Sequence, residues 1–342
     1  VGIAKNDDIV EIINSVMLDR RVVTFGDKLC HNMEGDKLQS TLPHYAYLRI
    51  ADGCSNKCSY CAIPLIRGKM RSRKMENIIE GAKKFAENGV KELVIVAQDV
   101  TAYGIDLYKK YALPDLLKQL CKIDGIKWIR LLYCYPERMT DELIETIKTE
   151  DKVLNYIDIP IQHCNKEILR NMYRGGDEQS LRELFAKLRR EIPGVVLRTT
   201  LITGFPGETE EQFGELAEFV NDIKFERLGC FAYSAEEDTP AAEMPDQVDE
   251  GERQRRADII TGEQEIRMGE YYAGMVGNTY EVVCEGFDRY SDMYFGRSMH
   301  FAPEIDGMIY FTSTKEKRPV IGDFINVKIT DVLENNLLGE QV

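Results

Sequence analysis

From residue 45 onward, apolar residues along the chain alternate between two spacings. Six short apolar runs predict β-strands, and between them apolar residues at intervals of three and four predict helices. The strands are predicted at residues 45–50, 93–97, 128–133, 154–159, 195–202 and 228–233. The helices are predicted at residues 78–86, 114–120, 141–147, 179–188 and 208–220. Strands that alternate with helices imply right-handed crossovers and a parallel sheet.

Six strand–helix units are too few for a complete eight-stranded barrel. They fit an α/β fold, either an open, partial parallel β/α barrel of about six strands or a doubly wound sheet. In both architectures, chemistry gathers beyond the carboxyl ends of the strands. We therefore expect functional residues in the segments that directly follow the apolar runs.

Both ends of the chain differ from this central part. Residues 248–272 are polar and helix-prone, and the four or five short β-prone segments after Gly274 predict a small antiparallel β-barrel. Residues 1–44 begin with helical apolar spacing and then become polar, as expected for the last helix and strand of a preceding domain followed by a linker. Because the chain starts at Val1 without a charged-then-apolar leader, we expect a fragment of a longer protein with no targeting signal.

Composition and charge narrow the class of protein. Hydrophobic residues make up 44% of the 342 residues, enough for a folded core, and no apolar run reaches the length of about 18 residues that crosses a membrane. The formal net charge of −14 disfavours a surface that binds nucleic acid throughout, although a local basic patch is compatible with it. The nine cysteines are far below the density of a disulfide scaffold, odd in number and without a secretion signal, which favours a reducing cytoplasm.

Three of the cysteines, Cys54, Cys58 and Cys61, lie within eight residues at CxxxCxxC spacing, directly after the first predicted strand. Structural zinc sites and closed iron–sulfur clusters take four ligands, whereas three cysteines on a four-iron cluster leave one iron open for chemistry. A coincidental group of cysteines and a zinc site are the alternatives. The zinc site would be completed by one of three residues, Cys30, His31 or His44.

The cysteine spacing, its place after the first strand and the aromatic Tyr60 just before the third cysteine resemble the radical S-adenosylmethionine superfamily. The resemblance implies a [4Fe–4S] cluster on Cys54, Cys58 and Cys61. Its unique iron would bind the amino and carboxylate groups of S-adenosylmethionine, and electron transfer would release a 5′-deoxyadenosyl radical. The partial, open β/α barrel is the architecture that this resemblance favours.

The resemblance extends to the methylthiotransferase family over nearly the whole chain. Residues 63–73, Ile-Pro-Leu-Ile-Arg-Gly-Lys-Met-Arg-Ser-Arg, match the run that follows the cysteines in that family, and the terminal barrel resembles its TRAM domain. Residues 1–44 would then be the remnant of an amino-terminal methylthiotransferase domain plus a linker, 45–272 the radical catalytic domain, and 273–342 a TRAM-like barrel for substrate docking. The full-length family holds a second [4Fe–4S] cluster on three cysteines of the amino-terminal domain, and no such triplet precedes Cys54 here.

Two branches of the family differ in substrate. One modifies an adenosine in transfer RNA, and the other modifies the β-carbon of an aspartate in the twelfth small-subunit ribosomal protein. Three segments resemble the protein-modifying branch: residues 97–104, residues 233–241, in which Asp238 replaces the usual Gly, and Ala-Pro-Glu-Ile-Asp-Gly at 302–307. The transfer RNA enzyme stays open as an alternative, as does a non-catalytic, metal-stabilised binding module.

Charge also bears on the partner. Residues 273–342 hold six basic and eleven acidic residues, a net charge of −5. A barrel that clamps RNA phosphates should be basic, so this one favours docking on a basic ribosomal protein, free or on the small subunit. Beside the cysteines, a basic run would contact ribosomal RNA or a substrate carboxylate, or else form a solvated loop. It consists of Arg67, Lys69, Arg71, Arg73 and Lys74.

The resemblance also implies a set of residues that contact S-adenosylmethionine, together with a reductant such as flavodoxin or ferredoxin and a cytoplasmic location. Gln98 or Asp99 would lie near the methionine moiety. The remaining contacts would come from Tyr60, Gly204, Phe205 and Tyr233.

For most of these residues, a purely structural role is an alternative interpretation. Asp99 would then end the second strand, and Tyr233 would cap the core. The loop at residues 203–208 would be a turn in which Glu208 starts a helix, where its charge favours the helix dipole. His163, after the fourth strand, would be a structural residue.

Overall fold

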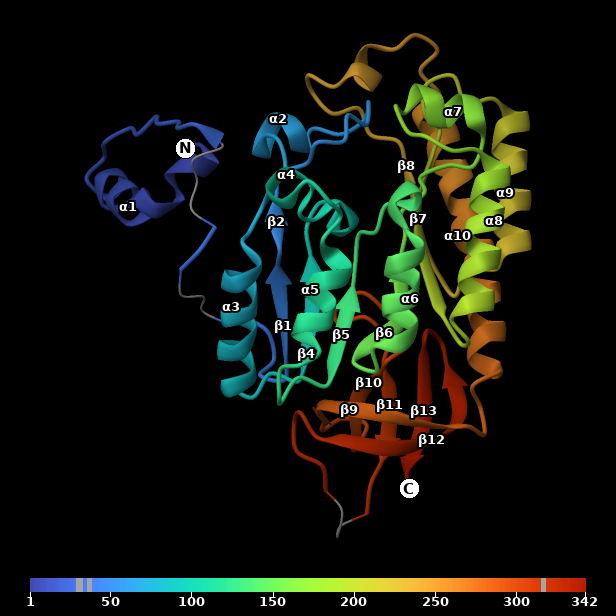
Figure 1. The fold of residues 1–342 in the computed structure, drawn as a ribbon. Helices are drawn as coiled ribbons and strands as arrows, with labels where there is room; N and C mark the ends of the chain where they lie inside the picture. The colour runs from blue at the N-terminus through green and yellow to red at the C-terminus, as the bar shows by residue number, and fades with distance from the viewer. Residues whose placement is uncertain (29–32, 36–38, 315–317) are drawn as a thin grey trace.

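The computed structural model describes residues 1–28, 33–35, 39–314 and 318–342. A six-stranded parallel sheet forms its centre, with the strands in the order β1-β4-β5-β6-β7-β8 (Figure 1). They are β1 (Tyr45–Arg49), β4 (Glu92–Val96), β5 (Trp128–Leu131), β6 (Val153–Asp158), β7 (Val196–Thr203) and β8 (Arg227–Ala232). Each lies within two residues of its predicted bounds. Because β1 and β8 do not pair, the sheet is a partial, open parallel β/α barrel, as predicted.

Helices cover the outer face of this sheet (Figure 1). The five predicted between strands are α3 (Met75–Glu87), α5 (Leu113–Leu120), α6 (Asp141–Thr149), α8 (Glu178–Glu191) and α9 (Glu210–Ile223). Their apolar sides and the sheet share one buried core, which includes Ile78, Leu117 and Phe185. The sequence does not predict three short helices that follow strand ends. These are α2 (Ile63–Arg67), α4 (Ile105–Tyr108) and α7 (Lys166–Asn171).

The long helix α10 (Glu250–Ala273) leads from the sheet to a closed five-stranded barrel of order β10-β11-β13-β12-β9. Its strands are β9 (Thr279–Asp288), β10 (Met293–Ser298), β11 (Ile309–Thr312), β12 (Phe324–Leu333) and β13 (Asn336–Gln341). The small barrel is confirmed with one correction, because β11 and β13 pair in parallel and the barrel is not wholly antiparallel. The sequence of β13, which has no β-branched or aromatic residue, does not predict a strand.

The barrel lies beneath the end of the sheet where the strands begin (Figure 1), and a buried ionic network joins the two. Glu92 accepts hydrogen bonds from Arg130 Nε at 2.7 Å and from Arg297 Nη2 at 2.9 Å. Arg297 Nε donates to Glu285 Oε1 at 2.8 Å, and His44 Nε2 lies 3.0 Å from the same oxygen. All five side chains are at most 5% exposed. Since an unpaired charge at this depth is very unfavourable, the network fixes how the barrel sits on the sheet.

The segment before the sheet contains α1 (Ile9–Met17), so the helix predicted near the start is confirmed. Residues 21–27 form no β-strand, although the Thr24 carbonyl oxygen accepts a hydrogen bond from the Gly2 N–H at 2.9 Å, so the strand predicted after this helix is not found there. β1 begins at Tyr45 and α10 ends at Ala273, while the division into three domains stays a prediction. In the part of the chain that the structure describes, no helix combines the length and apolarity needed to cross a membrane.

Candidate active site

The cysteine triplet lies in a loop that starts and ends on one short ladder. The strand β2 (Ala51–Asp52) precedes the loop and pairs antiparallel with β3 (Arg71–Ser72), which follows it. Gly53 opens the loop with a φ of 76°, and a Cβ at this position would lie 2.5 Å from the carbonyl oxygen of Lys69. The residue before Cys54 therefore has to be glycine.

Asp52 fixes the base of this loop. Its side chain is fully buried and accepts a hydrogen bond from Arg67 Nη1 at 3.0 Å, while Arg71 Nη2 lies 3.5 Å from its other oxygen. Arg49 Nη1 approaches the same carboxylate at 3.8 Å. Three guanidinium groups around one carboxylate therefore tie the two ends of the cysteine loop together.

The three arginines of the basic run are thus engaged in contacts within the protein. Arg73 is buried, pairs with the carboxylate of Glu34 and donates to the carbonyl oxygen of Arg49 at 2.8 Å. Lys69 and Lys74 are the exposed members of the run. Contact of the run with ribosomal RNA stays a prediction, and these two lysines are the residues placed to make it.

The thiols of Cys54, Cys58 and Cys61 line one cavity of about 790 Å³. The segments after β4, β5 and β6 form its walls, and Glu304 and Ile305 of the small barrel also reach it. Burial raises the pKa of Cys54 to about 11 and raises that of Cys61 above its usual value. Binding of a metal centre here therefore has to release protons.

The donor set favours a cluster over a single metal ion. Among the described residues, no three His, Cys, Asp or Glu side chains converge on one ion. Cysteines of a four-iron cluster bind different irons and lie farther apart than the ligands of one zinc ion, so three cysteines around one cavity fit a cluster. Of the predicted zinc ligands, His44 binds Glu285 in the buried network, and Cys30 and His31 lie outside the described residues.

Of the two residues predicted near the methionine moiety, Gln98 lines the cavity. Its buried amide oxygen has no hydrogen-bond partner among the described residues, and an amino group of a bound ligand would supply one. The Asp99 carboxylate joins its own strand end to the cysteine loop, from which Asn56 Nδ2 donates to it at 2.9 Å. The carboxylate also accepts from Thr101 Oγ1 at 2.6 Å and the Ala102 backbone N–H at 3.1 Å, and pairs with Arg138. A contact of Asp99 with the methionine moiety stays a prediction.

Tyr60 also lines the cavity, beside a cation that was not among the predicted site residues. The buried guanidinium of Arg174 lies 3.4 Å from Tyr60 Oη and 4.0 Å from Cys58 Sγ. It donates to the Pro160 carbonyl oxygen at 2.8 Å and sits 4.3 Å from the centre of the Tyr135 ring. A signal for it in the sequence is the Tyr-Arg-Gly-Gly turn at residues 173–176.

The other three predicted cofactor contacts do not line this cavity. Phe205 is fully buried and packs edge-on against Tyr233, with ring centres 5.5 Å apart. Gly204 has a φ of 68°, and a Cβ there would lie 2.3 Å from Arg253 Cγ, so glycine is required by the close approach of α10. Adenosine contacts by Gly204, Phe205 and Tyr233 stay predictions.

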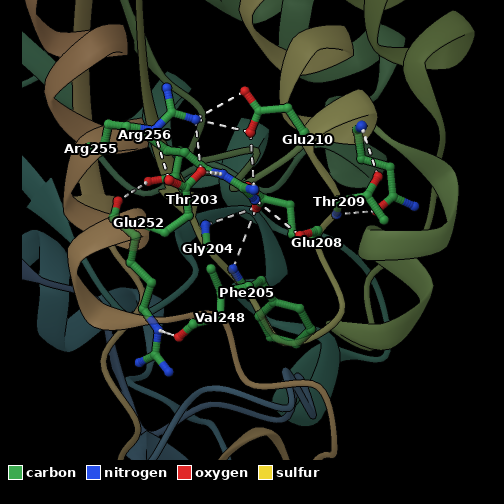
Figure 2. A network of polar contacts seen from close by, with 12 residues as sticks. Thr203, Gly204, Phe205, Glu208, Thr209, Glu210, Val248, Glu252, Arg255 and Arg256 are labelled. Carbon is green, nitrogen blue, oxygen red and sulfur yellow. Dashed lines mark hydrogen bonds and ion pairs between the residues drawn. The ribbon is translucent and has the colours of Figure 1, made fainter.

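The loop after β7 instead forms the polar network of Figure 2. The Glu208 carboxylate accepts from the backbone N–H groups of Gly204 at 3.0 Å and Phe205 at 3.4 Å, and pairs with Arg256 Nη1 at 2.8 Å. His163 Nε2 lies 3.6 Å from the same carboxylate, and both side chains are fully buried. This arrangement is compatible with a loop that forms a turn before α9. It is also compatible with a structural role for His163.

Two histidines, the fully buried His163 and the partly buried His300, make the fold sensitive to acid. Burial lowers the pKa of His163 to about 3 and that of His300 to about 4, with Arg256 and Arg227 acting in the same direction. The folded pKa values lie below that of an unfolded histidine, so the unfolded chain binds more protons as the pH falls below about 6.5. Stability should therefore decrease from about pH 6.5 towards pH 4, with a slope of about 1.4 kcal/mol per pH unit for each histidine.

Urea unfolding at pH 7.5, 6.0 and 5.0 measures this dependence. His300→Asn removes one of the two histidines that take up a proton on unfolding. The free energy of unfolding of this variant should therefore fall less steeply with decreasing pH than that of the original protein. Parallel curves for the two proteins would contradict the assignment.

The chain matches models of the radical SAM superfamily over residues 48–220 and of the TRAM domain over residues 276–342. It is 47% identical to ribosomal protein uS12 methylthiotransferase RimO of Caldanaerobacter subterraneus subsp. tengcongensis, over 99% of this chain and 77% of that protein. It is 50% identical to the protein of the same name in Clostridium botulinum, over 90% of this chain and 68% of that protein. Among solved structures, coproporphyrinogen III oxidase (HemN) from Escherichia coli, a radical SAM enzyme, has the same core fold. It shows a TM-score of 0.51 at 18% identity, covering 67% of this chain and 54% of that one.

A partial β/α barrel with a CxxxCxxC loop at the carboxyl end of its first strand, matched by this superfamily, defines a radical S-adenosylmethionine enzyme. The TRAM domain and the relatives narrow the class further. The chain belongs to the RimO family of ribosomal protein uS12 methylthiotransferases. The cofactors of this family are a [4Fe–4S] cluster and S-adenosylmethionine, and the cavity fits them, with three thiols, the unpartnered amide oxygen of Gln98 and a buried cation at Arg174.

Proposed function

We propose that this enzyme adds a methylthio group to the β-carbon of an aspartate in ribosomal protein uS12. The observation that carries the proposal is the cavity in which Cys54, Cys58 and Cys61 face Gln98 and Arg174, in a chain whose relatives are named for uS12 methylthiolation. The enzyme is accordingly a transferase of sulfur-containing groups.

Within the cavity, the side chains have separate roles. The three cysteines hold the cluster, and Gln98 and Arg174 bind the amino and carboxylate groups of the methionine moiety. When bound, the two cofactors supply one-electron reduction and hydrogen abstraction. Tyr60 and Tyr135 hold the Arg174 guanidinium from two sides, by a hydrogen bond and a ring contact, so that its charge stays directed into the cavity.

The partners follow from charge and from the family. The net charge of −5 on residues 273–342 supports docking of a basic ribosomal protein, free or in the small subunit, and Lys69 and Lys74 are available for local contact with ribosomal RNA. A flavodoxin or ferredoxin supplies the electron, and the reaction takes place in the cytoplasm. A second [4Fe–4S] cluster would belong to the amino-terminal domain of the full-length family.

The two alternatives have less support. A transfer RNA adenosine methylthiotransferase would need a basic barrel, and the barrel here is acidic. A non-catalytic, metal-stabilised module would not need an unpartnered amide and a buried cation beside its cysteines. The relatives reported above carry the name of the protein-modifying enzyme.

Anaerobic turnover of the full-length enzyme with recombinant uS12, S-adenosylmethionine, a reductant and a sulfur source tests the function. We expect one uS12 peptide to gain a methylthio group in place of a hydrogen, with fragmentation that places it on an aspartate. A parallel reaction with transfer RNA should leave the RNA unchanged. Modification of transfer RNA alone, with a steep dependence on salt, would contradict the proposal.

Arg174→Gln should raise the KM for S-adenosylmethionine by about 10- to 100-fold, because it removes a charged hydrogen-bond donor from a buried site. The measurement is 5′-deoxyadenosine formation as a function of cofactor concentration. Arg170→Gln is the control, since this arginine is highly exposed and pairs loosely with Glu167 at 3.8 Å, and it should leave the KM unchanged. A fall in iron content with an unchanged KM would assign Arg174 to cluster binding instead.

A further inference from the structure

We propose that Glu304, a residue of the small barrel, binds a cationic side chain of the protein substrate, a lysine or arginine close to the modified aspartate. The inference rests on the proposed function and deepens it, because it names a feature that the substrate must have. It also gives the Ala-Pro-Glu-Ile-Asp-Gly segment at 302–307 a role in the catalytic cavity.

Glu304 lies in the catalytic cavity although it belongs to the small barrel. It lies in the connection between β10 and β11, far along the chain from the cysteines, yet Glu304 and Ile305 line the same cavity as Cys54, Cys58 and Cys61. Along β1, the residues that share this cavity run from Tyr47 in the middle of the strand towards the cysteine loop after its end. A peptide segment whose target residue faces the cysteines therefore brings a neighbouring side chain to Glu304.

Side chains of the parallel sheet hold the connection between β10 and β11 in place. Arg130 Nη1 donates to the Met299 carbonyl oxygen at 2.9 Å, from the buried network that joins barrel and sheet. The Asp306 carboxylate accepts a hydrogen bond from Tyr156 Oη at 2.8 Å and lies 3.6 Å from Arg227 Nε. Both arginines and Tyr156 belong to strands of the sheet, so Glu304 is positioned by the catalytic domain as well as by its own barrel.

Two tyrosine hydroxyls orient the carboxylate of Glu304. Tyr45 Oη donates to one oxygen of Glu304 at 2.8 Å, and Tyr47 Oη donates to the other at 3.2 Å. Glu304 itself is exposed and has a left-handed φ of 64°, a conformation that non-glycine residues keep only where the surroundings impose it. A carboxylate offers about four acceptor sites, so the two hydroxyls leave acceptors that face the cavity.

The Glu304 carboxylate has no cationic side chain paired with it in the part of the chain that the structure describes. Of the two arginines that line the cavity, Arg49 approaches Asp52, and Arg174 lies beside Tyr60 and Cys58. Tyr47 and Tyr133 line the same cavity, and Tyr133 is held with a φ of 63° while 44% exposed. An oriented carboxylate in a cavity lined by tyrosine rings favours a cation, through ion pairing and through the ring faces.

The experiment compares Glu304→Gln with the original full-length enzyme in anaerobic turnover of uS12. We expect kcat/KM for uS12 to fall by about 10- to 100-fold, mainly through KM, as for the loss of one charged hydrogen bond. Iron content and melting temperature should match those of the original enzyme. Glu340→Gln makes the same charge change at an exposed position of the same barrel outside the cavity, and should leave kcat/KM nearly unchanged.

Substrate variants then identify the cation. Each lysine and arginine near the modified aspartate of uS12 is changed to glutamine in turn, and one change should lower turnover by the original enzyme as much as Glu304→Gln does. That variant should cause no further loss with Glu304→Gln, since both remove the same contact. Equal losses for Glu304→Gln and Glu340→Gln, or strictly additive losses for every pair, would overturn the inference. An original enzyme that leaves uS12 unmodified would instead overturn the proposed function, and this inference with it.

Discussion

Cys58→Ala should leave the protein folded but unable to hold its cluster or to cleave S-adenosylmethionine. After anaerobic reconstitution, the chain described here should carry about four irons, as expected for one [4Fe–4S] site. Cys58 is one of three thiols in the cavity, so alanine leaves two ligands and removes the sulfur that lies 4.0 Å from Arg174. We expect iron content and 5′-deoxyadenosine formation to fall to background, measured by iron analysis and by chromatography of the quenched reaction.

Cys121→Ala is the matched control. Cys121 is a partly buried thiol at the end of α5 and does not line the cavity, so its loss should change neither iron content nor product formation. Retention of about four irons by Cys58→Ala would contradict the ligand assignment. An iron content of about eight in the unchanged chain would show that a second cluster site had been overlooked.

Arg297→Met should destabilise the protein by about 3–5 kcal/mol, the largest stability loss that we expect from a single substitution. Burial alone would raise the pKa of Glu92, but Arg297 and Arg130 together hold it below its usual value. Methionine fills a similar volume and leaves Glu92 and Glu285 with too little positive charge in a buried junction. The denaturant midpoint of unfolding measures the loss.

An exposed ion pair across the same junction provides the comparison. Lys127 Nζ lies 2.5 Å from Glu281, and both side chains are more than 40% exposed, so Lys127→Met should cost about 1 kcal/mol or less. The double variant Glu92→Gln/Arg297→Met should lose less than the sum of its single changes, because the two groups share one contact. Similar losses for Arg297→Met and Lys127→Met would mean that the buried network does not hold the barrel in place.

Local patterns predicted most of the catalytic domain because each strand and helix has its own periodicity. The short helices α2, α4 and α7 are only four to six residues long, too short for a periodic signal. The parallel pairing of β11 with β13 depends on how a closed barrel brings distant segments together, and no local pattern encodes it.

In the candidate site, too, local sequence predicted some residues and the tertiary fold was needed for others. Cysteine spacing located the metal-binding loop. Three successive residues, Val96, Ala97 and Gln98, line the cavity, so the alternation of a strand does not separate Gln98 from Asp99. Arg174 and Glu304 reach the cavity only through the tertiary fold, one from a turn after α7 and one from the small barrel. No spacing rule relates either residue to the cysteines.

The ladder of β2 and β3 has a consequence for maintenance of the enzyme. The loop is closed by the backbone pairs Ala51↔Ser72 and Asp52↔Arg71 and by the contacts of Asp52, none of which involves a thiol. The base of the metal-binding loop is therefore held by contacts that do not include the three cysteine side chains. We therefore expect that exposure to air inactivates the protein without unfolding it, and that anaerobic reconstitution of the folded enzyme restores its activity.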